Sequence, residues 1–345
     1  MAVKKYKESI LNNNLNQEKL VYIFEHLKKM SYNIIFKNRK DEAELYDLYD
    51  AGLSAYIHNS NLSEAQKCFD KLKQYAEYVT IEKYLRSRNK MVVFLCDNLR
   101  FDEALILADE NIAYHDLLSY MKKELFGETF TEALNHAIAL SQRAQVYAFL
   151  NDERAETDFL DALEIMDEGT PDRYITQSYL LHYYLCQGMK CEYENLAIEY
   201  FGNKTSLMEQ FNYIAKEGSR EKNAKLSMKY ALYVYAKALY VFYIDQIPIK
   251  LLNKLKDIEK ALCGVSKQAE KQINGHPWEI IYKYLALIMA THGYYFEKEL
   301  YFEKLDKMFC RSEGLIKDIY LESISKIKHF EISCEHDEKF TFMFY

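Results

Sequence analysis

The chain has 345 residues, 49% of them hydrophobic, and its 45 basic and 52 acidic side chains give a formal net charge of −7. This length suits two domains or one elongated array, and the apolar content argues against disorder. The acidic excess is spread in short mixed runs, which disfavours nucleic acid as a partner.

Apolar residues recur at spacings of three and four through almost every segment, and long runs of strict alternation are nearly missing. The first pattern is typical of helices and the second of strands. Glycine and proline, which punctuate loops, number only 10 and 3. The chain is therefore predicted to be all-α. In chain order, the predicted helices span residues 17–37, 41–59, 63–78, 81–98, 101–122, 130–150, 153–167, 171–188, 190–201, 205–217, 221–246, 248–262, 277–292, 296–310 and 314–328.

Several helix starts have local signals. Ser63 with Gln66, and Thr129 with Glu132, fit the capping box, in which two side chains satisfy backbone N–H groups of the first turn. Each of the three prolines stands at a predicted helix opening, where a missing N–H costs nothing. They are Pro171, Pro248 and Pro277. Because the predicted connections are only a few residues long, consecutive helices are expected to lie antiparallel beside one another.

The sequence predicts a cytoplasmic protein outside membranes. The basic cluster KKYK at residues 4–7 precedes a polar stretch, which is unlike a secretory signal. The least polar run, residues 230–244, is shorter than a bilayer span and contains Lys237, so we interpret it as a buried helix. Seven cysteines, an odd number without a CxxC pair, favour reduced thiols over a disulfide framework.

One short pattern recurs along the chain. In AYIHNSNLSEAQKCFDKL, residues 55–72, a polar turn is followed by Ala65 and, one helical turn later, by Phe69. Similar stretches place Ala104 and Ala108, and then Ala155 and Phe159, after a turn. Two weaker copies follow Gly188, where the small residue is lost, and Gly293, where Phe302 is kept.

With Tyr49, Tyr56, Ala65 and Phe69 at the motif's offsets, the chain resembles the tetratricopeptide repeat (TPR) family of helix pairs. The resemblance covers residues 41–168, and helix rhythm extends it over 171–310. It departs from the family because successive alanines are 39 and 51 residues apart, and because Arg88 and Ala139 replace the aromatic of the first helix. It implies a right-handed superhelix, or solenoid, with a helical segment at 1–40, repeats at 41–246, continuing hairpins at 247–330 and a tail at 331–345.

The family usually binds peptides or partner proteins on the concave face of the array. The resemblance places six candidate residues on this face, against the alternative that they are ordinary solvated positions. They are Asp47, Asp50, Ser54, His58, Lys283 and Thr291. A seventh candidate, Lys237, is the single charge in the apolar run 230–244. Because a buried ammonium is costly alone, Lys237 is expected to reach solvent, to pair with a carboxylate or to meet a ligand.

Metal binding and catalysis have weak signals. His182 and Cys186 share a helix face near Cys191, but no second pair with zinc-like spacing is nearby. The segment 329–340 gathers His329, Cys334 and His336 with several acids, and is interpreted as a solvated tail. Glycine-rich phosphate loops, GxSxG and HExxH are missing from the sequence, so neither a cofactor nor an enzymatic activity is predicted.

The leading hypothesis is a scaffold that binds a protein or peptide segment. An alternative is a regulator resembling the bacterial peptide-pheromone receptors, which would act by sequestering a partner protein, because only about forty residues precede the first predicted unit. An enzyme with an unrecognised site is the third hypothesis. Oligomeric state is not predicted.

Overall fold

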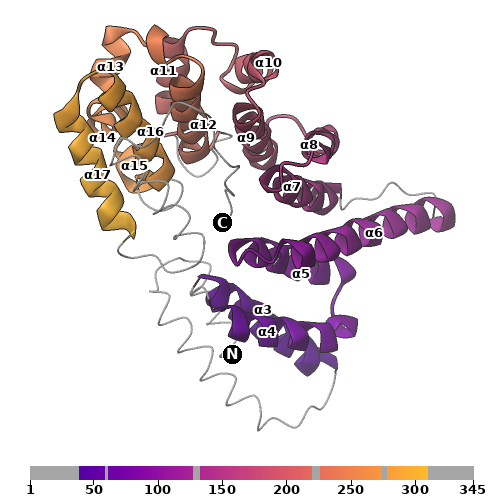
Figure 1. Ribbon diagram of the computed structural model, residues 1–345. Helices are drawn as coiled ribbons and strands as arrows, with labels where there is room; N and C mark the ends of the chain where they lie inside the picture. The colour runs from indigo at the N-terminus through magenta and orange to yellow at the C-terminus, as the bar shows by residue number, and fades with distance from the viewer. Residues whose placement is uncertain (1–38, 59–60, 127–132, 220–225, 274–277, 310–345) are drawn as a thin grey trace. The chain divides into compact units, whose positions relative to one another are not determined.

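The computed structural model describes residues 39–58, 61–126, 133–219, 226–273 and 278–309 (Figure 1). Within these ranges the chain forms α-helices and two short 3-10 helices, and it contains no strand, which confirms the all-α prediction. The predicted helices at 17–37 and 314–328, the Thr129 cap, Pro277 and the tail lie outside the described residues.

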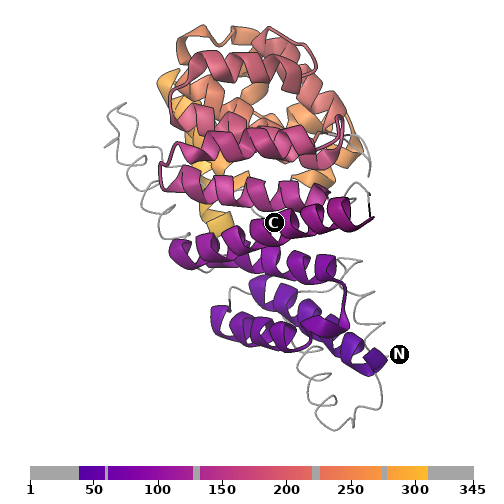
Figure 2. The ribbon, with the colours of Figure 1, turned by 90° about the vertical axis from the view of Figure 1, so that its right-hand side faces the viewer.

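The chain divides into two compact units, Met1–Gln142 and Arg143–Tyr345, with the division inside one helix. The predicted boundaries at residues 41, 247 and 331 stay predictions. The first unit contains α3 (Arg39–His58), α4 (Leu62–Gln74), η1 (Ala76–Tyr78), α5 (Ile81–Asp97), α6 (Phe101–Phe126) and the start of α7 (Ala133–Phe149). Helix α3 packs against α4, and α5 packs against α6, as both views show (Figures 1 and 2).

The second unit follows α7 with further helices that pack on their neighbours. They are α8 (Arg154–Ile165), α9 (Pro171–Cys186), α10 (Lys190–Tyr200), α11 (Leu207–Glu217), α12 (Met228–Val241), η2 (Ile244–Gln246), α13 (Ile249–Leu255), α14 (Ile258–Cys263), α15 (Lys267–Gln272), α16 (Trp278–Thr291) and α17 (Tyr295–Phe309). Helix α9 contacts α8, α10 and α12, and α12 in turn contacts α11 and α16. Helix α16 also packs on α17 (Figure 1).

A similar turn follows six of the described helices. In each, a backbone N–H bonds to the carbonyl five residues earlier, as in the 6→1 bond of a Schellman motif, which satisfies a carbonyl that the helix end leaves open. The donor and acceptor pairs are Asn61 and Tyr56, Arg100 and Leu95, Asp152 and Tyr147, Met189 and Tyr184, Asn203 and Ile198, and Tyr294 and Met289, all at 2.7–2.9 Å. In five of these turns at least one residue has positive φ, namely Leu99, Asn151, Gly188, Gly202 with Asn203, and Gly293.

The small residues predicted at the helix seams are buried. Ala65, Ala104 and Ala155 are all 0% exposed, and Phe69 and Phe159 are at most 3% exposed. A small side chain lets two helices approach closely, and the ring fills the space beside it. The burial predicted for these positions is therefore confirmed.

In four of the helix pairs, the fourth residue of the second helix packs at the seam with the first helix, and its identity changes along the chain. It is alanine in α4 and α6, but Tyr193 in α10 and Lys298 in α17, and both of these are buried. The Tyr193 ring lies 5.6 Å from that of Phe242. The bulkier residue explains why the sequence pattern fades after residue 170, because packing at this seam is achieved by different shapes.

Some local predictions were wrong. The cap of α4 is Asn61, whose side-chain oxygen accepts from the Glu64 N–H at 3.2 Å, so Ser63 lies inside the first turn. Thr170 caps α9 and Pro171 is its first residue, as predicted. Pro248 stands one residue before α13.

The predicted helix at 248–262 is broken. Helix α13 ends at Leu255, and Asp257 caps α14 by accepting from the Lys260 N–H at 3.2 Å. The break is bridged from α17, because the buried Tyr301 hydroxyl donates to the Leu255 carbonyl and accepts from the Ile258 N–H at 3.3 Å. The predicted helix at 221–246 is shorter, since α12 ends at Val241 and η2 follows.

The Tyr301 bridge is testable. Tyr301→Phe leaves one carbonyl and one N–H at the break without this partner, so the free energy of unfolding is expected to fall by about 1–3 kcal/mol. Urea unfolding followed by circular dichroism measures the change. The matched control is Tyr295→Phe, on the same helix but 59% exposed, which is expected to stay within about 0.5 kcal/mol of the parent. Equal stability of both variants would show that the bridge is dispensable.

Candidate functional site

Helix α9 is the centre of the second unit, and its two sides differ. Residues 176–185 are all buried, because α8, α10 and α12 surround the helix. One side faces α12, where Tyr179 meets Tyr230 and His182 meets Tyr233 at ring distances of 6.1 and 4.8 Å. Arg173, Gln177, Leu180 and Tyr184 recur every three to four residues and therefore share another side of the helix.

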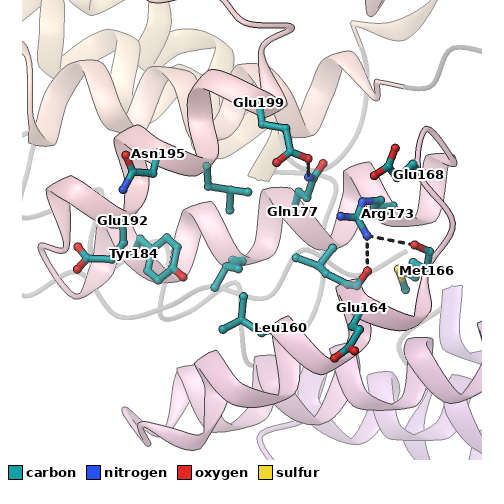
Figure 3. A pocket seen from close by; sticks show the side chains of 13 residues that line it. Leu160, Glu164, Met166, Glu168, Arg173, Gln177, Tyr184, Glu192, Asn195 and Glu199 are labelled. Carbon is teal, nitrogen blue, oxygen red and sulfur yellow. Dashed lines mark hydrogen bonds between the residues drawn. The ribbon is translucent and has the colours of Figure 1, made fainter.

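This other side of α9 forms the floor of a pocket between α8 and α10 (Figure 3). The pocket has a volume of about 750 Å³ and is open to solvent, a size typical of ligand sites. Its apolar lining consists of Leu160, Leu163, Met166, Leu180 and Leu196. Leu163, Met166 and Leu180 are at most 7% exposed, so the apolar surface that a ligand side chain could cover lies mainly on Leu160 and Leu196.

The rim of the pocket is acidic. Glu164, Glu168, Glu192 and Glu199 line it, all with exposed side chains, and Asn195 adds a neutral amide. Arg173 is the one cationic residue of the lining. Its guanidinium already donates to the carbonyls of Leu163 and Met166, where α8 ends. The charge presented to a ligand is therefore negative on balance.

Hydrogen bonds hold the polar residues of the floor. The Gln177 amide donates to the Glu199 carboxylate at 3.0 Å, which links α9 to α10 (Figure 3). The Tyr184 hydroxyl donates to Glu156 of α8 at 2.9 Å. Burial, and then this hydrogen bond to Glu156, raise the pKa of Tyr184 well above its usual value. Tyr184 is consequently a neutral donor at physiological pH, and its bond fixes α8 against α9.

The candidate residues of α3 form a polar network within the first unit. Lys90 of α5 donates to both carboxylate oxygens of Asp50 at 2.8 and 2.9 Å, and to Ser54 at 3.2 Å. Ser87 donates to Asp50 at 2.7 Å, and Asp47 pairs with Lys83. The network joins α3 to α5, so a partner that used these carboxylates would have to compete with two lysines. His58 ends α3, and its side chain lies outside the described residues.

The remaining candidates lie in the second unit. The Lys283 ammonium lies 5.3 Å from the Tyr284 ring centroid, and the exposed Thr291 donates to the Leu287 carbonyl at 3.0 Å. Lys237 is only 1% exposed, which disfavours the first of the three alternatives given for it, that it reaches solvent. Its ammonium donates to the Cys186 thiol at 3.1 Å. None of the seven candidate residues lines the pocket.

Within the described ranges, no group of three or more His, Cys, Asp or Glu side chains is placed to hold a metal ion. Cys191 is exposed on α10, whereas His182 is fully buried on α9. His329, Cys334 and His336 lie outside the described residues. In the same ranges no helix combines the length and apolar character needed to cross a bilayer.

The sequence matches no protein-family model and no curated protein. The site therefore has to be interpreted from its own geometry. Sequence reasoning missed the pocket because its residues come from three helices, each with an ordinary pattern. The detectable signal was small. Helix α10, the second helix of the α9–α10 pair, lacks alanine at the seam, and its exposed side carries Glu192 and Glu199.

Proposed function

We propose that the chain is a non-enzymatic scaffold that binds a protein or peptide segment, built from TPR-like helix pairs stacked in a right-handed array. The recurrent helix-ending turn and the buried Ala65, Ala104 and Ala155 support the repetition of one kind of helix pair. A repeated helix pair buries its apolar side only against neighbours, which produces extended surfaces for partners. The described cysteines form no disulfide, which supports a reducing compartment such as the cytoplasm.

The observation that carries this proposal is the open pocket between α8 and α10. It combines an apolar floor with four exposed glutamates and holds one arginine that is engaged by backbone carbonyls. Apolar area supplies affinity, and charge complementarity supplies selectivity and association rate. The chemistry that fits is a segment with a leucine-sized or aromatic side chain flanked by lysine or arginine.

The proposed partner class can be tested with short labelled peptides that place Leu or Phe between Lys and Arg, against copies with Glu at the basic positions. Fluorescence anisotropy is expected to show binding of the basic series only, weakening as salt rises. The variant Glu164→Gln/Glu168→Gln/Glu192→Gln should bind about tenfold more weakly, since each exposed charge contact contributes roughly 0.5 kcal/mol.

Glu303→Gln is the matched control, because Glu303 is exposed on α17 and does not line the pocket. It is expected to bind like the parent. Equal affinity of the parent and the triple variant for the basic peptides, or equal binding of both peptide series, would contradict the acidic rim as the recognition element. Binding that requires Asp50 or Lys283 instead would move the site to the predicted concave face.

A further inference from the structure

A cluster of reactive side chains joins α9 to α12 on the side of α9 that faces away from the pocket. Cys186 is the last residue of α9 and is partly exposed. Lys237, in the middle of α12, is 1% exposed and directs its ammonium to the Cys186 sulfur at 3.1 Å. The peptide-binding function makes no use of this contact.

Further titratable groups surround this pair. His182, one turn before Cys186, is fully buried with its ring nitrogens 3.8 and 4.0 Å from the sulfur. The Tyr233 hydroxyl of α12 lies 2.8 Å from His182 Nε2. The Tyr284 ring of α16 lies 5.9 Å from the Lys237 ammonium. On α9, Tyr183 is a further neighbour in sequence, and burial followed by the Glu156 charge raises its pKa.

The Lys237 ammonium lies directly against the Cys186 sulfur. A neighbouring ammonium stabilises the negative sulfur, which is the nucleophilic form of cysteine. The carbonyl end of α9 opposes this, but it corresponds to about half an elementary charge spread over the last turn. Partial exposure of Cys186 leaves a path for a molecule as small as hydrogen peroxide.

We propose that Cys186 and Lys237 form an oxidisable pair, in which a hydroperoxide converts them to a sulfur–nitrogen cross-link between α9 and α12. The thiolate attacks one peroxide oxygen, the O–O bond breaks, and Cys186 becomes a sulfenic acid while hydroxide leaves. The hydroxide takes a proton from the Lys237 ammonium and becomes water. The Lys237 amine then attacks the sulfur, the S–O bond breaks, and a second water leaves with one amine proton.

The sulfur is oxidised by two electrons, the peroxide is reduced to two waters, and the protein loses two hydrogens. A first thiol reverses the cross-link by attacking the sulfur and returning the amine, which leaves a mixed disulfide at Cys186. A second thiol attacks this disulfide and releases the Cys186 thiol. The cross-link ties the middle of α12 to the end of α9, a restraint that the reduced protein lacks. This inference holds whether or not the pocket binds a peptide.

Peptide mapping by mass spectrometry tests the proposal on the full chain treated with hydrogen peroxide. The expected product is a peptide pair joining the α9 and α12 sequences, lighter by two hydrogens than the sum and released by dithiothreitol. It should be missing in Cys186→Ser and in Lys237→Met, which keeps a similar shape without the amine. The presence or absence of the cross-linked peptide pair in the parent protein is the deciding observation, so the result does not depend on the folding of a variant.

Cys191, exposed five residues later on α10, is the internal control. At peroxide levels that oxidise about half of Cys186 in the parent, Cys191 is expected to be oxidised about tenfold less, because thiolate population sets the rate. Lys237→Met should remove this difference. Two results overturn the proposal. In the first, Cys186 is oxidised no faster than Cys191. In the second, Cys186 is oxidised only to its sulfenic, sulfinic or sulfonic acid while Lys237 stays unmodified.

Discussion

Replacing Phe159 by alanine is expected to lower the free energy of unfolding of the second unit by about 3–5 kcal/mol. Phe159 is 0% exposed on α8, and its ring centroid lies 6.5 Å from that of Tyr183 on α9. Removing the ring takes away buried apolar area and leaves a cavity at the seam between these helices. Urea unfolding followed by far-ultraviolet circular dichroism measures the loss.

The neighbouring Leu160 provides the control, because it lies on the same helix and is 48% exposed. Leu160→Ala removes a smaller, aliphatic group from a position that is about half exposed, so the free energy of unfolding is expected to fall by less than about 1 kcal/mol. If both substitutions cost the same, Phe159 does not hold α8 against α9 and the packing assigned to the repeat pattern is incorrect.

Stability is also expected to fall in mild acid because of a histidine in the first unit. His115 is 0% exposed on α6, and its ring is stacked on that of His136 of α7 at 5.4 Å between centroids. Burial is the largest cause, and His136 the second, of a shift that lowers the pKa of His115 from 6.5 to about 4. The nearby carboxylates of Asp116 and Glu82 act in the opposite direction.

The sign follows from proton uptake. Between pH 6.5 and 4 the unfolded chain binds a proton at residue 115 and the folded chain does not, so the free energy of unfolding falls as the pH falls. The expected loss from this residue is about 3 kcal/mol across that interval. Below pH 4 both states carry the proton, and the loss from His115 stops.

Comparing the free energy of unfolding of the parent with that of His115→Leu isolates the contribution of His115, since the carboxylates titrate in both proteins. Unfolding by urea at pH 7, 6, 5 and 4 should give curves that converge as the pH falls, with the parent losing more. Parallel losses in the two proteins would mean that His115 takes up its proton equally well in the folded state.

Much of the helical architecture was predictable because it depends on local signals. Helices predicted at 81–98, 171–188 and 190–201 end within two residues of those observed. Thr80 and Thr170 accept from N–H groups three residues later, so each start depends on side chains next to it in sequence. Predictions failed where a distant residue intervenes, as at the α13–α14 break, where Tyr301 of α17 satisfies the backbone.

The sequence by itself determined the helical class, the positions of most helices, and the burial of Ala65, Ala104, Ala155 and Phe159, because periodicity, caps and side-chain size act over a few residues. Only the tertiary structure decided where a site can form. The pocket depends on the separation of α8 and α10 over the floor of α9, and the contact of Lys237 with Cys186 depends on the packing of α12 against α9. Both arise from side chains far apart in the chain that meet only after helices pack, and no spacing along one helix encodes that meeting.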